Sequence, residues 1–346
     1  MPIRTKEIEV ERKAVASSSP ADRFSLPDDL LLQLRKSGKP IAVAALARKY
    51  KIDSATVEQV IDSIASWGYK LKRTKENVQF VDAPDILSAT EIGYGLKTKL
   101  IGMQIHSYRS LKSTNDLAAD LAEHGAPEGT VVTSEEQTKG RGRLGRIWHS
   151  VAHNGIYVSI VLRPEIRPDQ APGISIMTSL ALLEAFASFT KKPLAIKWPN
   201  DLLLSGKKVA GILTELNADR GKINHVIVGV GINVNHNRDD FPDTLIDTAT
   251  SLRLANGEAA NRVELLKEFL RRFEKQYAKY LKSGLKSVHG SLKKHSSLLG
   301  NEVTIRSGDS SQSGKAVDIT ANGELVLSQN GVRIVIAAGE VTVAKS

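Results

Sequence analysis

A segment rich in glycine and arginine, residues 140–148, carries the densest chemical signal in this 346-residue chain. Its sequence is Gly-Arg-Gly-Arg-Leu-Gly-Arg-Ile-Trp. The glycines allow the backbone to approach a ligand closely, and the arginines supply forked donors for phosphate or carboxylate. The segment matches G-x-G-x-x-G, but three arginines fill it and no apolar-periodic helix follows, so a Rossmann dinucleotide turn is rejected. The composition favours a mobile loop that closes over a polyphosphate, with a nucleic-acid-binding Gly/Arg stretch as the alternative.

A second signal lies at the end of a predicted strand, where residues 197–201 have the sequence Lys-Trp-Pro-Asn-Asp. Lys197 offers a point charge to phosphate, and Asn200 offers a hydrogen bond to a phosphate or a base. Asp201 offers an oxygen ligand for Mg²⁺, which normally also binds substrate phosphates. A Pro-Asn-Asp turn without any ligand is the common alternative.

Three further segments have the residue types of a small-ligand site. Residues 206–215 deliver Lys208 onto a strand in which Gly211 leaves room for a ligand, so Lys208 is the candidate to face a carboxylate. Residues 229–235 place two glycines inside a strand, which often marks close approach by another group, although a β-bulge is the alternative. Ser113-Thr114-Asn115 begins a predicted helix, where polar side chains suit a small head group but capping alone also explains them.

The elements that must position these residues fall into successive regions. Residues 1–25 are polar and charged and are expected to form a flexible leader. Residues 26–85 predict three helices and a β-hairpin, which is the element order of a winged helix-turn-helix. Residues 88–284 mix strands and helices, which indicates a sheet backed by helices. Residues 291–346 predict closely spaced short strands, as in a small β-barrel.

Caps and periodicity set the expected limits of individual elements. Asp28 or Asp29 is expected to cap the first helix, and Ser54 is expected to cap the third, which ends at Trp67. The central region predicts strands over residues 131–134, 155–162, 194–198, 209–216 and 225–234, and helices over residues 115–124, 174–189 and 263–281.

The composition of the chain limits its function classes. It contains no cysteine, which excludes disulfides, thiolate metal sites and cysteine nucleophiles. The net charge of +10 favours anionic partners and is equally explained by a basic soluble surface. No apolar run has the length of a membrane span and the N-terminus has no secretory h-region, so we expect a cytoplasmic protein with no membrane contact.

Taken in order, these five segments resemble the biotin protein ligases. The order is Ser-Thr-Asn, Gly-Arg-Gly-Arg-x-Gly-Arg-x-Trp, Lys-Trp-Pro-Asn-Asp, Lys-x-Ala-Gly-Ile-Leu and Gly-x-Gly-Ile-Asn. The flanking regions resemble the bifunctional class, which is both ligase and biotin-operon repressor. The resemblance implies an α+β multidomain fold with an N-terminal winged helix-turn-helix, a central mixed sheet with helices of the class II synthetase type, and a C-terminal SH3-like β-barrel.

The resemblance also implies an activity. A chain of this family uses ATP and Mg²⁺ to attach biotin, through biotinyl-5′-AMP, to a lysine of biotin carboxyl carrier protein, a subunit of acetyl-CoA carboxylase. Operator DNA and a homodimer formed through the central sheet are further implied partners. A lipoate or octanoate protein ligase, which shares the central fold, is one alternative. A transcription regulator that senses a ligand without turnover is another.

Roles for individual residues follow from the same resemblance. The implied catalytic residues are Lys208, Arg143 and Arg141. The implied biotin-binding residues are Ser113, Thr114, Asn115, Gln137, Gly140, Arg141, Gly142, Arg143, Lys208, Gly211 and Gly229. The implied nucleotide-binding residues are Arg146, Trp148, Lys197, Asn200 and Asn233, with Asp201 as the metal ligand.

The predicted recognition helix, Ser54 to Trp67, decides what is expected of DNA binding. The second helix of such a motif enters the major groove. Here it contains Glu58 and Asp62 and no Lys or Arg, whereas phosphate contacts need basic residues. Positive charge lies before and after it, at Arg48, Lys49, Lys51, Lys70, Lys72, Arg73 and Lys75. These residues suit backbone contacts, and a retained domain without operator specificity is the alternative.

Overall fold

The structure, a computed structural model, describes residues 26–307, 310–337 and 339–343. The predicted leader, residues 1–25, lies outside the described residues. The chain divides into two compact units, Met1–Pro84 and Asp85–Ser346. Among the described residues, no helix combines the length and the apolar character needed to cross a membrane.

Within residues 26–84, the N-terminal unit contains three helices and a small antiparallel sheet, as predicted. Apolar side chains at helical spacing on its third helix, such as Val57, Ile61 and Ile64, are fully buried, and they pack against the other helices and the sheet. The strand order is β1-β3-β2. The elements are α2 (Leu26–Ser37), β1 (Ile41–Ala42), α3 (Val43–Tyr50), α4 (Ser54–Ser66), β2 (Lys70–Arg73) and β3 (Asn77–Asp82).

Two capping predictions in this unit are wrong. Asp53, and not Ser54, caps α4: its carboxylate accepts a hydrogen bond from the Thr56 N–H at 2.7 Å, and Ser54 is already helical. Asp28 and Asp29 lie inside the first turn of α2 and do not precede it. Negative charge in that turn still favours the helix, because it faces the positive end of the helix dipole.

Arg73 joins the β-hairpin to α4. Its guanidinium pairs with Glu58 and lies 2.5 Å from the Asp62 carboxylate. The two acidic side chains of α4 are therefore partly neutralised from within the unit, since one positive charge faces two negative ones. Arg73 was expected to be among the basic residues that contact the DNA backbone. That expectation is corrected, because its charge is already paired within the unit.

The second unit is built on a seven-stranded mixed sheet. The strand order is β4-β5-β6-β10-β9-β8-β7, and β4 with β5 is the parallel pair. The five strands predicted in this region are present, whereas β4 and β8 were not predicted. The strands are β4 (Ile105–Tyr108), β5 (Val131–Ser134), β6 (Gly155–Leu162), β7 (Leu194–Lys197), β8 (Asp201–Leu204), β9 (Lys207–Asp219) and β10 (Lys222–Asn233).

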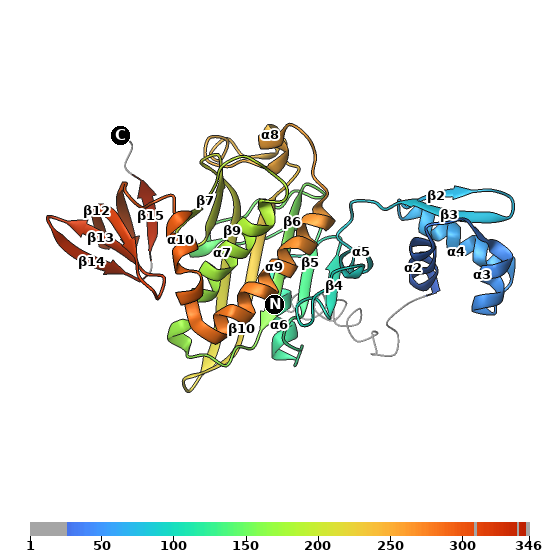
Figure 1. The fold of residues 1–346 in the computed structure, drawn as a ribbon, viewed down its shortest axis with the longest axis horizontal. Coiled ribbons are helices and arrows are strands. Elements are labelled where there is room, and N and C mark those ends of the chain that lie inside the picture. The colour runs from blue at the N-terminus through green and yellow to red at the C-terminus, as the bar shows by residue number, and fades with distance from the viewer. Residues whose placement is uncertain (1–25, 308–309, 338, 344–346) are drawn as a thin grey trace, which may run out of the picture. The chain divides into compact units, whose positions relative to one another are not determined.

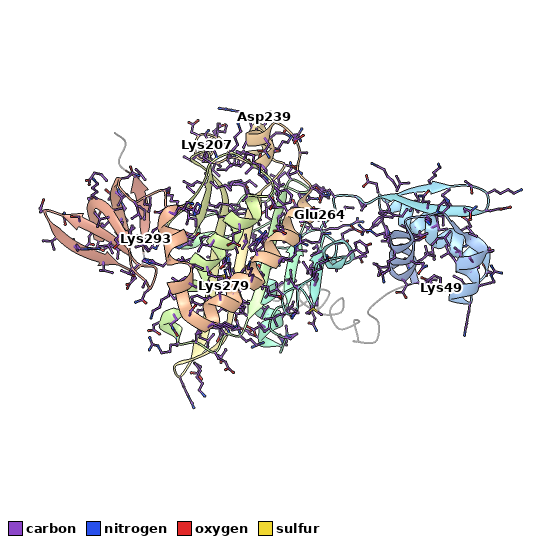
Figure 2. The ribbon with its side chains drawn as sticks, in the orientation of Figure 1. Lys49, Lys207, Asp239, Glu264, Lys279 and Lys293 are labelled. Carbon is purple, nitrogen blue, oxygen red and sulfur yellow. The ribbon has the colours of Figure 1, made fainter. Side chains whose placement is uncertain are left out.

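Two long helices, α7 (Pro172–Phe186) and α9 (Arg262–Ser283), lie together over one face of this sheet (Figure 1). Almost every side chain of α7 is buried, because the helix packs against both the sheet and α9. One side of α9 is apolar and the other is charged, and Lys279, labelled in Figure 2, is among its exposed side chains. The other helices are α5 (Ala89–Gly93), α6 (Thr114–Glu123), α8 (Leu252–Asn256) and α10 (His289–Lys294).

The C-terminal part of the second unit is a five-stranded antiparallel sheet with the order β14-β13-β12-β11-β15. The closely spaced short strands predicted for this region are present. The indole N–H of Trp198, a side chain that is 2% exposed, donates to the Gly323 carbonyl at 2.7 Å and so ties this sheet to the strand ends of the larger one. The strands are β11 (Glu302–Ser307), β12 (Ser310–Ile319), β13 (Leu325–Gln329), β14 (Val332–Ile336) and β15 (Glu340–Val343).

Candidate active site

Two glycines that face each other on neighbouring strands form a bare floor in the large sheet. Gly211 of β9 and Gly231 of β10 are register partners, and the register is unbroken here, so the β-bulge alternative does not apply. The Trp148 indole covers both glycines. A Cβ added at Gly231 would lie 2.3 Å from Trp148 Cε2, and one at Gly211 would lie 2.9 Å from Cζ3. These glycines are therefore required for close packing of an aromatic ring against the backbone.

Polar side chains gather at the start of α6. Ser113 caps this helix, with its hydroxyl 3.4 Å from the Asp116 N–H, which confirms its predicted capping role. The backbone N–H and the hydroxyl of Thr114 both donate to Oε1 of Gln137, at 2.8 and 3.1 Å. Ser113 and Thr114 are nearly fully buried. The arrangement leaves a pocket lined by hydroxyl and amide groups, which suits a small polar head group.

The amide of Asn115 lies directly over Gly229 of β10. A Cβ at Gly229 would come within 2.1 Å of Asn115 Oδ1. That oxygen accepts a hydrogen bond from the Ser159 hydroxyl at 2.6 Å, and Nδ2 donates to Glu215 at 2.6 Å. Gly229 thus makes room for a fixed amide, which in turn forms one wall of the pocket.

The glycine- and arginine-rich segment forms a loop with one short 3-10 turn, Arg143–Gly145. Arg141 pairs with Asp116 at 2.5 Å and with Glu215 at 3.2 Å. Arg143 donates to Asn200 Oδ1 at 3.1 Å and to the Gly339 carbonyl at 3.5 Å. The arginines therefore fasten the loop to both walls of the pocket.

Lys208 and Asp201 form an ion pair at the edge of the glycine floor. Lys208 Nζ lies 2.8 Å from Asp201 Oδ1 and 5.4 Å from the centroid of the Trp148 ring. The Asp201 oxygen is buried and has no partner with hydrogen-bond geometry, so the lysine charge is what stabilises it. Across the described residues, no three His, Asp or Glu side chains come together to hold a metal ion. A single carboxylate of this kind fits Mg²⁺, which takes one or two carboxylates together with substrate phosphates.

Two adjoining cavities meet at this point, and both are lined by Arg143, Trp148 and Lys208. The first has a volume of about 50 Å³, and the second has a volume of about 760 Å³. Sites for small ligands have volumes of roughly 300–1,000 Å³, so the first cavity must open to admit a ligand. Residues of the predicted biotin set that line the first cavity are Ser113, Thr114, Asn115, Gln137, Arg141, Gly142, Arg143, Lys208, Gly211 and Gly229. Residues of the predicted nucleotide and metal set that line the second are Arg146, Trp148, Lys197, Asn200, Asp201 and Asn233.

Gly140 is the member of the predicted biotin set that lines neither of these two cavities. Its carbonyl accepts a hydrogen bond from the Trp148 N–H at 2.9 Å, and a Cβ would lie 2.5 Å from the Trp148 carbonyl oxygen. This glycine lets the two ends of the loop approach each other.

His236 and Phe241 line the large cavity and were not predicted from the sequence. Their rings stack with centroids 5.4 Å apart. Burial lowers the pKa of His236 to about 4, so the imidazole is neutral near pH 7. They lie in a segment without strand or helix periodicity, so no pattern marks them.

A buried ion pair supports the strand end beside Gln137. Arg262, which is 1% exposed, lies 2.6 Å from the Glu135 carboxylate and 3.1 Å from the Asp85 carboxylate. It also donates to the Gly155 carbonyl at 3.1 Å. Because Glu135 is itself buried, the charges of this cluster depend on one another.

Comparisons with known proteins agree with this geometry. Residues 106–233 match the biotin/lipoate A/B protein ligase family, and residues 298–343 match the biotin protein ligase C terminal domain. The chain is 36% identical to a bifunctional ligase/repressor of Bacillus subtilis, over 91% of this chain and 98% of that protein. It is 33% identical to the biotin–[acetyl-CoA-carboxylase] ligase of Mycobacterium tuberculosis, over 71% of this chain and 93% of that protein. A solved biotin protein ligase from Aquifex aeolicus, in complex with biotin and ATP, superposes with a TM-score of 0.62 and 31% identity, covering 70% of this chain and all of that one.

Proposed function

The chain belongs to the biotin protein ligase family, and we propose that it attaches biotin to a lysine of a biotin carboxyl carrier protein by way of biotinyl-5′-AMP. Family membership confirms both the resemblance noted in the sequence and the predicted enzyme class. The observation that carries the proposal is the pair of adjoining cavities that share Arg143, Trp148 and Lys208. The reaction requires an acid and a nucleotide to meet, and the cationic side chains of Arg143 and Lys208 lie where the two cavities join.

In the first step, an oxygen of the biotin carboxylate attacks the α-phosphorus of ATP. The bond from that phosphorus to the bridging oxygen breaks, and pyrophosphate leaves with the electron pair. Negative charge accumulates at the α-phosphate, so positive groups fixed beforehand lower the barrier. Lys208 and Arg143, which line both cavities, supply this charge, and Lys197 supplies it from the wall of the large cavity. Lys208 acts through its charge and position and forms no covalent bond.

Asp201 is the residue that would hold Mg²⁺. The ion, when bound, adds positive charge to the phosphate oxygens. The buried Asp201 oxygen has Lys208 as its charge partner and no hydrogen bond of good geometry, so it is able to take a cation as a ligand.

In the second step, the neutral amine of the carrier lysine attacks the acyl carbon of the adenylate. The bond from that carbon to the phosphate oxygen breaks, AMP leaves, and the nitrogen loses a proton. The loop that contains Arg141 and Gly142 excludes water from the adenylate until the amine arrives. No step needs a thiol, which agrees with the absence of cysteine.

The large cavity suits the nucleotide in size and in lining. Trp148 offers an aromatic face to adenine, and Asn233 offers an amide whose Nδ2 is held by the Thr250 carbonyl at 3.1 Å. Arg146 and Lys197 offer charge to the phosphates.

Exchange of labelled pyrophosphate into ATP tests the first step without any carrier. We expect exchange that requires biotin and Mg²⁺. Exchange that requires octanoate or lipoate, and that biotin does not support, would show that the substrate acid is not biotin. No exchange with any acid would support the alternative of a regulator that senses a ligand without turnover. Lys208→Ala or Arg143→Ala proteins with undiminished exchange would contradict the roles given to these residues.

We further propose that residues 26–85 form a winged helix-turn-helix that binds DNA mainly through its backbone, and that residues 291–346 form an SH3-like barrel. Three helices with a hairpin support the first assignment, and five antiparallel strands support the second. Pairing of Arg73 with Glu58 and Asp62 reduces the charge repulsion expected between α4 and phosphate. Lys72 and Lys75 are exposed on the hairpin and suit phosphate contacts.

Fluorescence anisotropy with promoter DNA and scrambled DNA, over a range of salt concentrations, tests this second proposal. We expect affinities for the two sequences that agree within about threefold and a log–log salt slope of about −0.9 per phosphate contact. A hundredfold preference for the promoter of the chain's own biotin genes would instead show operator reading. No binding at low salt would contradict the proposal that residues 26–85 bind DNA.

A further inference from the structure

We infer that Glu215 is a positioning residue that holds the head-group pocket and the closing loop in one arrangement. The inference rests on the proposed ligase reaction and assigns a role to a side chain outside the predicted site. Glu215 lies on β9, paired in register with Ile227 of β10, and is 41% exposed. Its two carboxylate oxygens contact two different parts of the site.

One oxygen of Glu215 fixes the orientation of the Asn115 amide. Oε2 accepts a hydrogen bond from Asn115 Nδ2 at 2.6 Å. The Ser159 hydroxyl on the other side of the amide is able to donate or accept, so it does not decide which way the amide turns. An ionised carboxylate only accepts, so the NH₂ group must face it. The Leu213 carbonyl also accepts from Nδ2, at 3.4 Å, so Glu215, which makes the shorter contact, is the main determinant of which polar atoms of Asn115 line the head-group pocket.

The other oxygen of Glu215 holds the loop. Oε1 lies 3.2 Å from Arg141, and the same guanidinium lies 2.5 Å from Asp116 of α6. Arg141 thus connects the loop to a strand on one side and to a helix on the other. All three side chains are about half exposed, with exposed fractions of 41–52%. Pairs of this kind are weak in water, so the connection is able to open for substrates and close again.

Because a single carboxylate makes both contacts, the orientation of the pocket amide and the closure of the loop are linked. A chain without Glu215 would bind the head group with a misplaced amide and would also cover the adenylate poorly. Water would then reach the mixed anhydride, and ATP would be consumed without transfer to the carrier.

Four variants separate the two contacts. Glu215→Gln keeps an oxygen that accepts from Asn115, but its NH₂ group cannot accept from Arg141. Asp116→Asn removes the negative charge of the other partner of Arg141 and leaves Asn115 untouched. Glu215→Leu removes both contacts. Asp219→Asn is the matched control, because it removes a charge from the same strand at an exposed position whose ion-pair partner is the adjacent Arg220 at 3.9 Å.

The test measures pyrophosphate released per biotinyl group transferred to a carrier domain, together with the KM for biotin. We expect a ratio near one for the unmodified chain and for Asp219→Asn. Glu215→Leu should raise the ratio about threefold or more and the KM for biotin about tenfold. Glu215→Gln and Asp116→Asn should raise the ratio similarly and change the KM by less than about twofold.

A purely structural role predicts fewer active molecules with an unchanged ratio and an unchanged KM. That result for Glu215→Leu would overturn the inference alone, and so would a ratio for Asp116→Asn equal to that of the control. An unmodified chain that releases no pyrophosphate with biotin would overturn the proposed function, and the inference with it.

Discussion

Replacing Gly229 with alanine is the most exacting single test of the pocket geometry. The added Cβ would lie 2.1 Å from Oδ1 of Asn115, and two atoms at that separation overlap severely. Asn115 has little freedom to move, since it is 4% exposed and is held by Ser159 and Glu215, each at 2.6 Å. Relief of the overlap requires the amide to leave this position.

The size of the effect follows mainly from the two short hydrogen bonds that must break, since the third, from Nδ2 to the Leu213 carbonyl, is long at 3.4 Å and therefore weak. Each contributes about 1 kcal/mol, so Gly229→Ala should lower the free energy of unfolding by about 2 kcal/mol. The same shift misplaces the amide that lines the head-group pocket, so the KM for biotin should rise by about tenfold or more. Gly290→Ala is the control, because a Cβ there meets nothing within 4 Å. It should change the free energy of unfolding by less than about 1 kcal/mol.

Urea unfolding of the single variants and of a double variant separates the overlap from other causes. Asn115→Ala alone loses the same two hydrogen bonds. Gly229→Ala combined with Asn115→Ala should therefore be no less stable than Asn115→Ala, a coupling of about 2 kcal/mol. Additive losses in the double variant would refute the reasoning, since Asn115 would then not be the group that the new methyl meets.

Further expectations concern buried charge and the junction of the cavities. Arg262→Met should lower the free energy of unfolding by about 3–5 kcal/mol, because the buried Glu135 carboxylate loses its arginine partner. Adding Glu135→Gln should restore part of the loss in the same urea titration. The pKa of His236 is lowered from 6.5 to about 4 by burial, so the unfolded chain binds the extra proton, and stability present above pH 6.5 should fall by up to about 3 kcal/mol as the pH drops toward 4. A His236→Gln chain should show a smaller fall over that range. Lys208→Met should lower kcat/KM for pyrophosphate release by about 100-fold, which is the usual effect of losing one preorganised group that stabilises charge in a transition state. A loss of only about tenfold or less would contradict the role of Lys208.

Much of the site could be predicted because its residues lie in short local motifs. The segment with Lys208 and Gly211 and the segment with Gly229 both fall on strands, and both line the small cavity. Glycine within a strand is unusual enough to mark a close approach, even though the sequence alone does not name the approaching group. The structure identifies those groups as Trp148, Lys208 and Asn115.

Other features depend on pairs of residues that are distant in the chain. Glu215 contacts Asn115 across 100 positions, so nothing near Glu215 in the sequence marks it. Arg73 was expected to be a free cation, and only the fold places it against Glu58 and Asp62. β4 and β8 were not predicted, and in the structure their pairing with β5 and with β7 defines them.

The central claim, transfer of biotin to a carrier lysine, is tested most directly by intact mass spectrometry of a carrier domain. The purified chain is incubated with biotin, MgATP and a biotin carboxyl carrier domain, and the mass of the carrier is measured before and after. The account predicts a gain of one biotinyl group that requires ATP and disappears when the acceptor lysine is replaced by arginine. An unchanged carrier mass, or a gain of an octanoyl or lipoyl group in place of biotin, would contradict it.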